Sequence, residues 1–301
     1  MKKTFLFIFL SLLCFRKAYS EDFFIMGNGE INLKGSGKLV YRSEKGYDEK
    51  ALRKINQAYG GDYDHSLSRL SLRFLEVLSN IQAHFKGAPL VIRSGYRSPH
   101  ENQGLRNQGK LAATSSMHIE AAAMDFYLEG VDTLELKNYA MSLPCCGVGY
   151  YHGKHIHLDT GPKRWWDEKT SGTEKKEPQE NEKIIALSTQ DIYPPPKNIS
   201  FDLARVTDFP FGIPASLKIE TLSQGEWKGF ASAKFLPSDD MGKIPSNPCY
   251  KLSERMHLKG LAAIPDKSLL PGRYRIKIIF CEKPWAKMPS EIYSNEFEVR
   301  K

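Results

Sequence analysis

The spacing of three potential metal ligands constrains this fold more than any other feature of the chain. His118 and Asp125 are seven residues apart, and His157 follows about thirty residues later. His118 and Asp125 cannot be neighbours on one straight helix, where contacts fall at three and four residues. They converge if the chain turns after His118 and a strand starts at Asp125, and the small residues 121–123 permit a close-packed turn. The sequence therefore predicts a turn followed by a strand.

A second strand is predicted over residues 156–159, because polar and apolar residues alternate in the stretch 155–159. A period of two places both histidines and Asp159 on one strand face. Pairing of the two strands would set Asp125 beside His157, with His118 reaching over. Zinc in hydrolytic sites takes three ligands of this kind and keeps a fourth position for water. We therefore expect these three residues to bind Zn2+.

The residues around these ligands also carry a family resemblance. The stretch Ser116-Met-His118-Ile-Glu-Ala-Ala-Ala-Met-Asp125, followed by the two histidines, resembles the signature of the zinc D,D-peptidases of the M15 type, and most closely their small periplasmic murein endopeptidases. The resemblance continues, in chain order, through Ser94-Gly95-Tyr96-Arg97-Ser98-Pro99, Asn102, Gly147-Val148-Gly149-Tyr150-Tyr151, His157-Leu158-Asp159-Thr160-Gly161 and Arg164-Trp165. It implies a hedgehog/D,D-peptidase-like fold, zinc as cofactor and peptidoglycan peptides as substrate.

Two positions depart from the family pattern. The family usually has glycine where this chain has Ala121, and alanine is strained there if its φ is positive. The related dipeptidase branch has a glutamate base three residues before its last ligand, where this chain has Lys154. The proton acceptor must therefore be another residue.

Three further residues are candidates for the chemistry. His155 shares the predicted strand face of His157, so it either acts on the water or the oxyanion or only supports the site. Asp159 orients an imidazole, accepts a proton or caps the turn that follows it. Arg97 is expected to bind a peptide carboxylate or the oxyanion through its planar guanidinium. Trp165 and Trp166 are expected to cover the core.

Composition divides the chain into four segments. Residues 1–20 read as a cleaved signal peptide, whose apolar run is too short to span a bilayer. Residues 167–183 are almost wholly polar and charged, which is typical of a linker. We predict a zinc D,D-peptidase-like domain over 21–166 and an accessory domain over 184–301. The protein is expected to be periplasmic or secreted, without stable membrane insertion.

The first domain is predicted to be α+β, with helices on one side of a small, largely antiparallel sheet. Helical spacing of apolar residues predicts helices at 48–59, 66–85 and 134–143, and strands are expected at 90–93, 124–127, 148–151 and 156–159. The accessory domain is predicted to be all-β and sandwich-like, with its clearest strands at 216–221, 230–235, 273–280 and 296–300. It contains no motif that identifies its partner.

Charge and cysteine usage bound the function further. The net charge of +8 falls to +4 without residues 1–20, an excess that suits acidic cell-wall polymers but gives no case for nucleic acid. Four cysteines remain, and an exported chain permits disulfides. We expect Cys249 to pair with Cys281. The adjacent Cys145 and Cys146 form a vicinal disulfide, remain buried thiols or bind metal.

These features predict an exported zinc peptidase that hydrolyses an amide bond in the peptide cross-links of peptidoglycan. By resemblance the bond is of the D,D or L,D type. Two alternatives remain open: a D,D-carboxypeptidase that trims stem peptides, and a non-catalytic, zinc-containing protein that binds the cell wall or a partner, as hedgehog-like relatives suggest.

Overall fold

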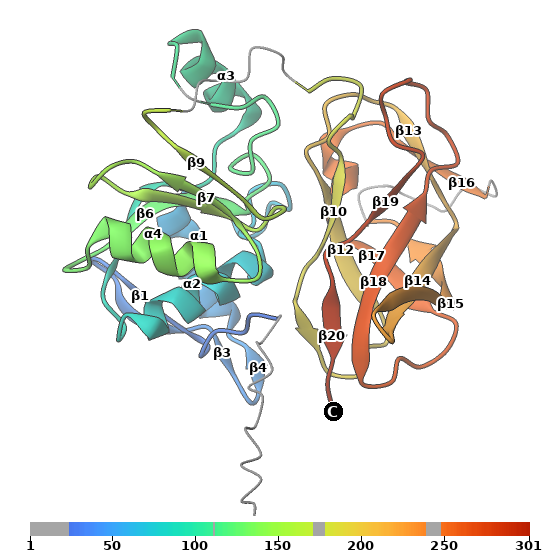
Figure 1. The fold of residues 1–301 in the computed structure, drawn as a ribbon, viewed down its shortest axis with the longest axis horizontal. Coiled ribbons are helices and arrows are strands. Elements are labelled where there is room, and N and C mark those ends of the chain that lie inside the picture. The colour runs from blue at the N-terminus through green and yellow to red at the C-terminus, as the bar shows by residue number, and fades with distance from the viewer. Residues whose placement is uncertain (1–23, 111, 171–177, 239–247) are drawn as a thin grey trace, which may run out of the picture.

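The computed structural model describes residues 24–110, 112–170, 178–238 and 248–301. The expected signal peptide and residues 171–177 of the expected linker lie outside the described residues. The described chain has a mixed α/β first half and an all-β second half, each with its own hydrophobic core. Figure 1 shows the two halves side by side. No helix in the described ranges has the length and apolar character needed to cross a membrane.

Seven strands of the first half form one sheet, in the order β2-β1-β5-β6-β8-β7-β9. They are β1 (Glu30–Leu33), β2 (Gly37–Val40), β5 (Leu90–Ser94), β6 (Ala123–Leu128), β7 (Gly147–Tyr150), β8 (Ile156–Asp159) and β9 (Arg164–Asp167), and β3 (Arg42–Ser43) pairs separately with β4 (Gly46–Tyr47). Only the β1–β5 and β7–β9 pairs of this sheet are parallel. The prediction of a largely antiparallel sheet is confirmed.

The helices of the first half are α1 (Glu49–Tyr59), α2 (Leu72–His84), α3 (Pro99–Asn107) and α4 (Thr133–Ser142). The helix predicted over 66–85 is wrong at its start. Ser71 caps α2 by accepting a hydrogen bond from Phe74 N, and the chain before it forms turns. Asn56 of α1 holds those turns, because its Oδ1 accepts a hydrogen bond from Leu70 N at 2.6 Å.

The alternation of side chains along β6 and β8 separates core from site. Phe126 of β6 and Leu158 of β8 are buried in one core cluster with apolar residues of α1, α2 and α4. Because neighbouring residues of a strand face opposite sides of a sheet, Asp125, His157 and Asp159 belong to the other face. Helices α1, α2 and α4 therefore cover one face of the sheet and leave the potential ligands on the other.

Nine strands of the second half form a second sheet, which curls around its core (Figure 1). They are β10 (Ile185–Ser188), β11 (Ile192–Tyr193), β12 (Ile199–Ala204), β14 (Ser216–Ser223), β15 (Glu226–Leu236), β17 (Leu261–Pro265), β18 (Gly272–Ile279), β19 (Glu291–Tyr293) and β20 (Phe297–Val299). Apart from these, β13 (Phe211–Pro214) pairs with β16 (Cys249–Leu252), and a 3-10 turn, η2, spans Arg255–Leu258.

The sandwich-like prediction for this half needs a correction. It is all-β, but hydrogen bonding runs continuously from β10 to β11 rather than dividing the main strands into two sheets. The register of the β14–β15 hairpin shifts between Ile219 and Glu220. Such irregularities increase local twist and bend a strand, which helps one sheet to enclose a core.

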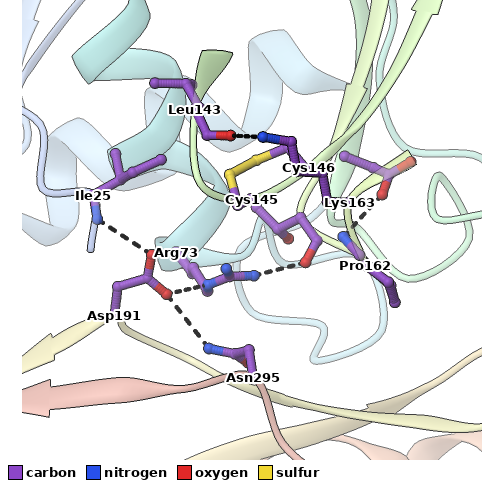
Figure 2. The surroundings of a disulfide bond; sticks show 12 residues. Ile25, Arg73, Leu143, Cys145, Cys146, Pro162, Lys163, Asp191 and Asn295 are labelled. Carbon is purple, nitrogen blue, oxygen red and sulfur yellow. Dashed lines mark hydrogen bonds and ion pairs between the residues drawn. A yellow bond between two sulfur atoms is a disulfide. The ribbon is translucent and has the colours of Figure 1, made fainter. Parts of the chain in front are cut away.

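The cysteines form two disulfides. Cys249 pairs with Cys281, which confirms the prediction. Cys145 and Cys146 form a vicinal disulfide between α4 and β7, so neither thiol serves as a metal ligand in this structure. Figure 2 shows this disulfide in the neighbourhood of Arg73 and Asp191, which join the two halves.

Candidate metal site

Pairing of two strands brings two of the three potential ligands together. β6 and β8 are antiparallel, and Asp125 lies directly opposite His157. His118 belongs to the turns that precede β6, and its carbonyl oxygen accepts a hydrogen bond from Arg97 N at 3.3 Å. Among the described residues these three form a buried group able to hold a metal ion. The predicted turn-then-strand geometry is confirmed here.

The distances among their facing atoms fit a tetrahedral ion. His157 Nδ1 lies 2.9 Å from Asp125 Oδ1 and 3.1 Å from His118 Nε2, and His118 Nε2 lies 3.3 Å from Asp125 Oδ1. Zinc bonds of about 2.0–2.1 Å in tetrahedral geometry place two ligand atoms about 3.3 Å apart. Two imidazoles and one carboxylate are also the donor set of hydrolytic zinc sites. These residues therefore fit a zinc ion with little rearrangement.

The second nitrogen of each imidazole is already engaged, which fixes the atom that faces the ion. His118 Nδ1 lies 2.7 Å from the carbonyl oxygen of Gly95, and His157 Nε2 lies 2.9 Å from Asp159 Oδ2. Ligand histidines commonly donate their other ring N–H to a carbonyl or a carboxylate in this way. The candidate ligand atoms are therefore His118 Nε2, Asp125 Oδ1 and His157 Nδ1.

Asp159 is fully buried and accepts hydrogen bonds on both oxygens. Besides the contact with His157, its carboxylate accepts hydrogen bonds from Gly161 N at 2.8 Å and from the two terminal nitrogens of Arg164 at 3.0 and 2.6 Å. A Cβ on Gly147 would lie 2.3 Å from this guanidinium and 2.5 Å from Asp159 Oδ2, so a larger residue there would displace this pair. The contacts hold the carboxylate behind His157 and direct it at the imidazole.

Arg97 stands on the other side of the ligands. Its Nη2 donates to Asp125 Oδ2 at 2.7 Å, and its Nε donates to Ser94 Oγ at 2.9 Å. Oδ2 of Asp125 is thereby occupied, while Oδ1 is left to face the histidines. The structure thus places Arg97 beside the site, as the resemblance implies.

Burial and neighbouring charges set the protonation of the candidate ligands. Burial lowers the pKa of His118, which favours the neutral imidazole that metals bind. Burial opposes ionisation of Asp125, but His118 and His157 outweigh it and hold the pKa of that carboxyl well below its usual range. Burial also disfavours protonation of His157, yet the hydrogen bonds of Asp125 and Asp159 raise its pKa overall. Two anionic groups thus favour positive charge at this position.

A groove of about 850 Å³ opens over the candidate ligands. His155 lines it and stacks on Tyr151, with ring centroids 4.4 Å apart. Trp166 lies 4.9 Å from the His157 ring, close to Gly149, where a Cβ would meet the indole at 2.5 Å. The expectation that the two tryptophans cover the core is wrong: Trp166 lines the groove, and the Trp165 residue is 67% exposed.

The two positions that depart from the family pattern have clear conformations. Ala121 has a φ of 51°, in the left-handed region, so the backbone there is strained for alanine. Lys154 is exposed, lines the groove and pairs with Glu168 at 3.3 Å. His152, in the turn between β7 and β8, pairs with Asp167 at 2.7 Å.

Comparison with known proteins agrees with this geometry. A family model described as peptidoglycan L,D-endopeptidase MepK, of the M15 peptidases, matches residues 27–166. Peptidoglycan L,D-endopeptidase MepK of Escherichia coli strain K12 is 32% identical over 131 residues, which cover 43% of this chain and 72% of that protein. This chain belongs to the M15-type peptidase family.

Two other relatives have similar names, identities and coverage. The peptidoglycan L,D-endopeptidase MepK of Shigella flexneri shows the same identity and coverage as the Escherichia coli protein. A probable peptidoglycan L,D-endopeptidase MepK of Haemophilus influenzae is 33% identical over 125 residues, 40% of this chain and 67% of that protein. No solved structure matches this chain. The M15 family match ends at residue 166, so the second half lies beyond it.

Sequence reasoning missed three residues around the site as individuals. Tyr151 and Arg164 occur only within matching phrases, without a role, and Trp166 is expected only to cover the core. The alternate glycines of β7 could have indicated large side chains next to this strand, because they leave room over one of its faces. Arg164 and Trp166, on neighbouring β9, use that room.

Proposed function

We propose that this protein is an exported zinc metallopeptidase that hydrolyses an amide bond in the peptide cross-links of peptidoglycan, as an L,D-endopeptidase. One observation carries the proposal: His118 Nε2, Asp125 Oδ1 and His157 Nδ1 converge at zinc-ligand spacing in a groove. The names of the relatives supply the substrate and the type of bond.

His118, Asp125 and His157 would hold the ion, which when bound supplies an activated water and polarises the scissile carbonyl. Asp159 positions the imidazole of His157 through Nε2 and keeps Nδ1 turned to the groove. Arg97 positions Asp125 through Oδ2 and also lines the groove. There its guanidinium can bind a carboxylate of the peptide or the developing oxyanion.

His155 is the proton acceptor in this proposal. It lines the groove, and burial lowers its pKa, so that the imidazole is neutral near pH 7 and able to take a proton. Asp159 is less suited to that role, because it is fully buried and its pKa is lowered by His157 and Arg164 against the effect of burial. We therefore assign proton transfer to His155 and orientation to Asp159.

The type of bond is tested with two purified muropeptide dimers, one joined by an L,D bond and one by a D,D bond. Mature protein and zinc are incubated with each, and the products are weighed by mass spectrometry. Cleavage of the L,D dimer alone supports the proposal. Cleavage of the D,D dimer alone would replace it with a D,D-endopeptidase, and loss of a terminal residue from free stem peptides, with both dimers intact, would replace it with a carboxypeptidase.

A further inference from the structure

The turn that carries His118 is attached to the second half of the molecule. Glu120 lies two residues after His118, and its side chain is only 2% exposed. Three groups of the second half contact its carboxylate: Arg255 Nη2 at 2.7 Å, Arg205 N at 3.2 Å and Lys259 Nζ at 3.6 Å. A buried carboxylate needs such charged and polar partners to offset its loss of hydration. Glu120 therefore ties this turn to the second half.

The backbone and the apolar side chains of the same turn make further contacts. Lys259 Nζ also donates to the carbonyl oxygen of Glu120 at 2.9 Å. Met117, Ala122 and Ala123 form a small buried cluster with Ala204 at the end of β12. Two partly buried residues of β10, Ile185 and Leu187, pack against this cluster. The turn is thus held by polar and apolar contacts at once.

A second connection reaches the strand that carries His157. Arg73 of α2 forms a buried ion pair with Asp191 of the second half, and its Nη1 donates to the carbonyl oxygen of Thr160 at 2.6 Å (Figure 2). Thr160 follows β8 directly, and its N donates to the carbonyl oxygen of Ala122 at 3.2 Å. Contacts therefore connect both segments that carry candidate ligands to the second half.

The conformation of the turn explains why such support matters. Ala121, between Glu120 and β6, has a φ of 51°. A non-glycine residue in this region stores strain and persists only where its surroundings hold it. Contacts on Glu120 and Ala122, its two neighbours in sequence, supply that constraint from the second half.

We infer that the second half is a working part of the metal site, in which Arg255 and Lys259 act through Glu120 as positioning residues for His118. This inference rests on the proposed zinc site but not on its catalytic activity. Both cations lie beyond residue 166, outside the family match, while Glu120 lies within it. Arg205 of the second half also lines the groove itself, as does Pro178 of the expected linker.

The test measures zinc affinity and local mobility of the mature full-length protein. Zinc dissociation constants come from competition with a chromogenic chelator, and hydrogen–deuterium exchange is followed in peptides covering residues 116–123. The variants are Arg255→Met and the charge-conserving Arg255→Lys. Arg275→Met is the matched control: its pair with Glu220 has side-chain exposures of 21% and 14% and a distance of 2.6 Å, but lies wholly within the second half.

Arg255→Met is expected to weaken zinc binding about 10-fold, at the lower end of what loss of an outer partner costs a metal site, and to speed exchange in residues 116–123. Arg255→Lys should recover most of the affinity. Arg275→Met should leave affinity and exchange unchanged even if it melts earlier. If Arg255→Met fails to fold, Lys259→Met carries the same comparison.

Wild-type affinity and unchanged exchange in a folded Arg255→Met protein would overturn the inference, as would an equal effect of Arg275→Met. Failure of the proposed function gives a different result. A wild-type protein that binds zinc but leaves muropeptide dimers intact would refute the peptidase and leave the positioning role standing. The exchange measurement reads the turn even in the absence of bound metal.

Discussion

Replacement of Asp159 by asparagine tests how the site is oriented. In the wild type, Oδ2 of Asp159 accepts hydrogen bonds from His157 Nε2 and from one terminal nitrogen of Arg164. Its Oδ1 accepts hydrogen bonds from Gly161 N and from the other terminal nitrogen of Arg164. An asparagine keeps one oxygen and offers an NH2 group in place of the other. In either orientation the amide nitrogen faces two donors, so the variant cannot satisfy the network.

The expected cost has two parts. Loss of hydrogen bonds to a charged group costs roughly 1.5–3 kcal/mol each, and partial exposure of Arg164 reduces its share, so we expect the free energy of unfolding of the metal-free protein to fall by about 2–3 kcal/mol. Loss of the partner that orients a ligand histidine typically weakens metal binding about 10–100-fold. The zinc dissociation constant of Asp159→Asn should therefore rise within that range.

Chelator competition and kinetics at saturating zinc separate orientation from proton transfer. If Asp159 only positions His157, kcat at saturating zinc should stay within about 10-fold of wild type, whereas loss of a general base costs roughly 100- to 10,000-fold. Glu220→Gln, which breaks an ion pair in the second half, is the control for general destabilisation. A folded Asp159→Asn protein with the zinc affinity of wild type would refute this reasoning.

Three further changes have defined outcomes. His155→Gln should lower kcat by roughly 100-fold or more with unchanged zinc affinity; near-normal turnover would remove it as the acceptor. Arg73→Met leaves Asp191 buried without its cation and should lower the free energy of unfolding in urea by about 3–5 kcal/mol, more than Arg73→Lys does; equal losses would contradict this. Replacing Cys249 and Cys281 by serine opens a loop with a separation of 32 residues. The free energy of unfolding of the oxidised wild type should therefore exceed that of the variant by about 3–4 kcal/mol. Equal denaturant midpoints of the two proteins would contradict this prediction.

Local patterns were sufficient where one face of an element is buried. The strand predicted at 156–159 has the same limits as β8, because alternation around His157 reports the two faces directly. The helix predicted from residue 66 failed because Leu67 and Leu70 extend the apolar spacing of α2 although Ser71 already caps it. The periodicity of apolar residues does not indicate where a helix is capped, whereas a serine at the cap position does.

One missed helix was readable from its cap. Ser98 and Glu101 form a capping box with Pro99 at the start of α3, a pattern visible in the sequence. The contacts of Glu120 were not readable, because its partners Arg255 and Lys259 lie about 135 residues away in the chain. Long-range ion pairs leave no local pattern, so the dependence of the site on the second half emerges only from the structure.

The central claim is that the His118–Asp125–His157 site hydrolyses peptidoglycan cross-links, and mass spectrometry of muropeptide dimers tests it most directly. Mature protein from residue 21 onward and a His157→Ala variant are each incubated with L,D-linked dimers and zinc. We predict conversion of dimers to monomers by wild type and none by the variant. Intact dimers with zinc-loaded wild type, or equal conversion by the variant, would contradict the account.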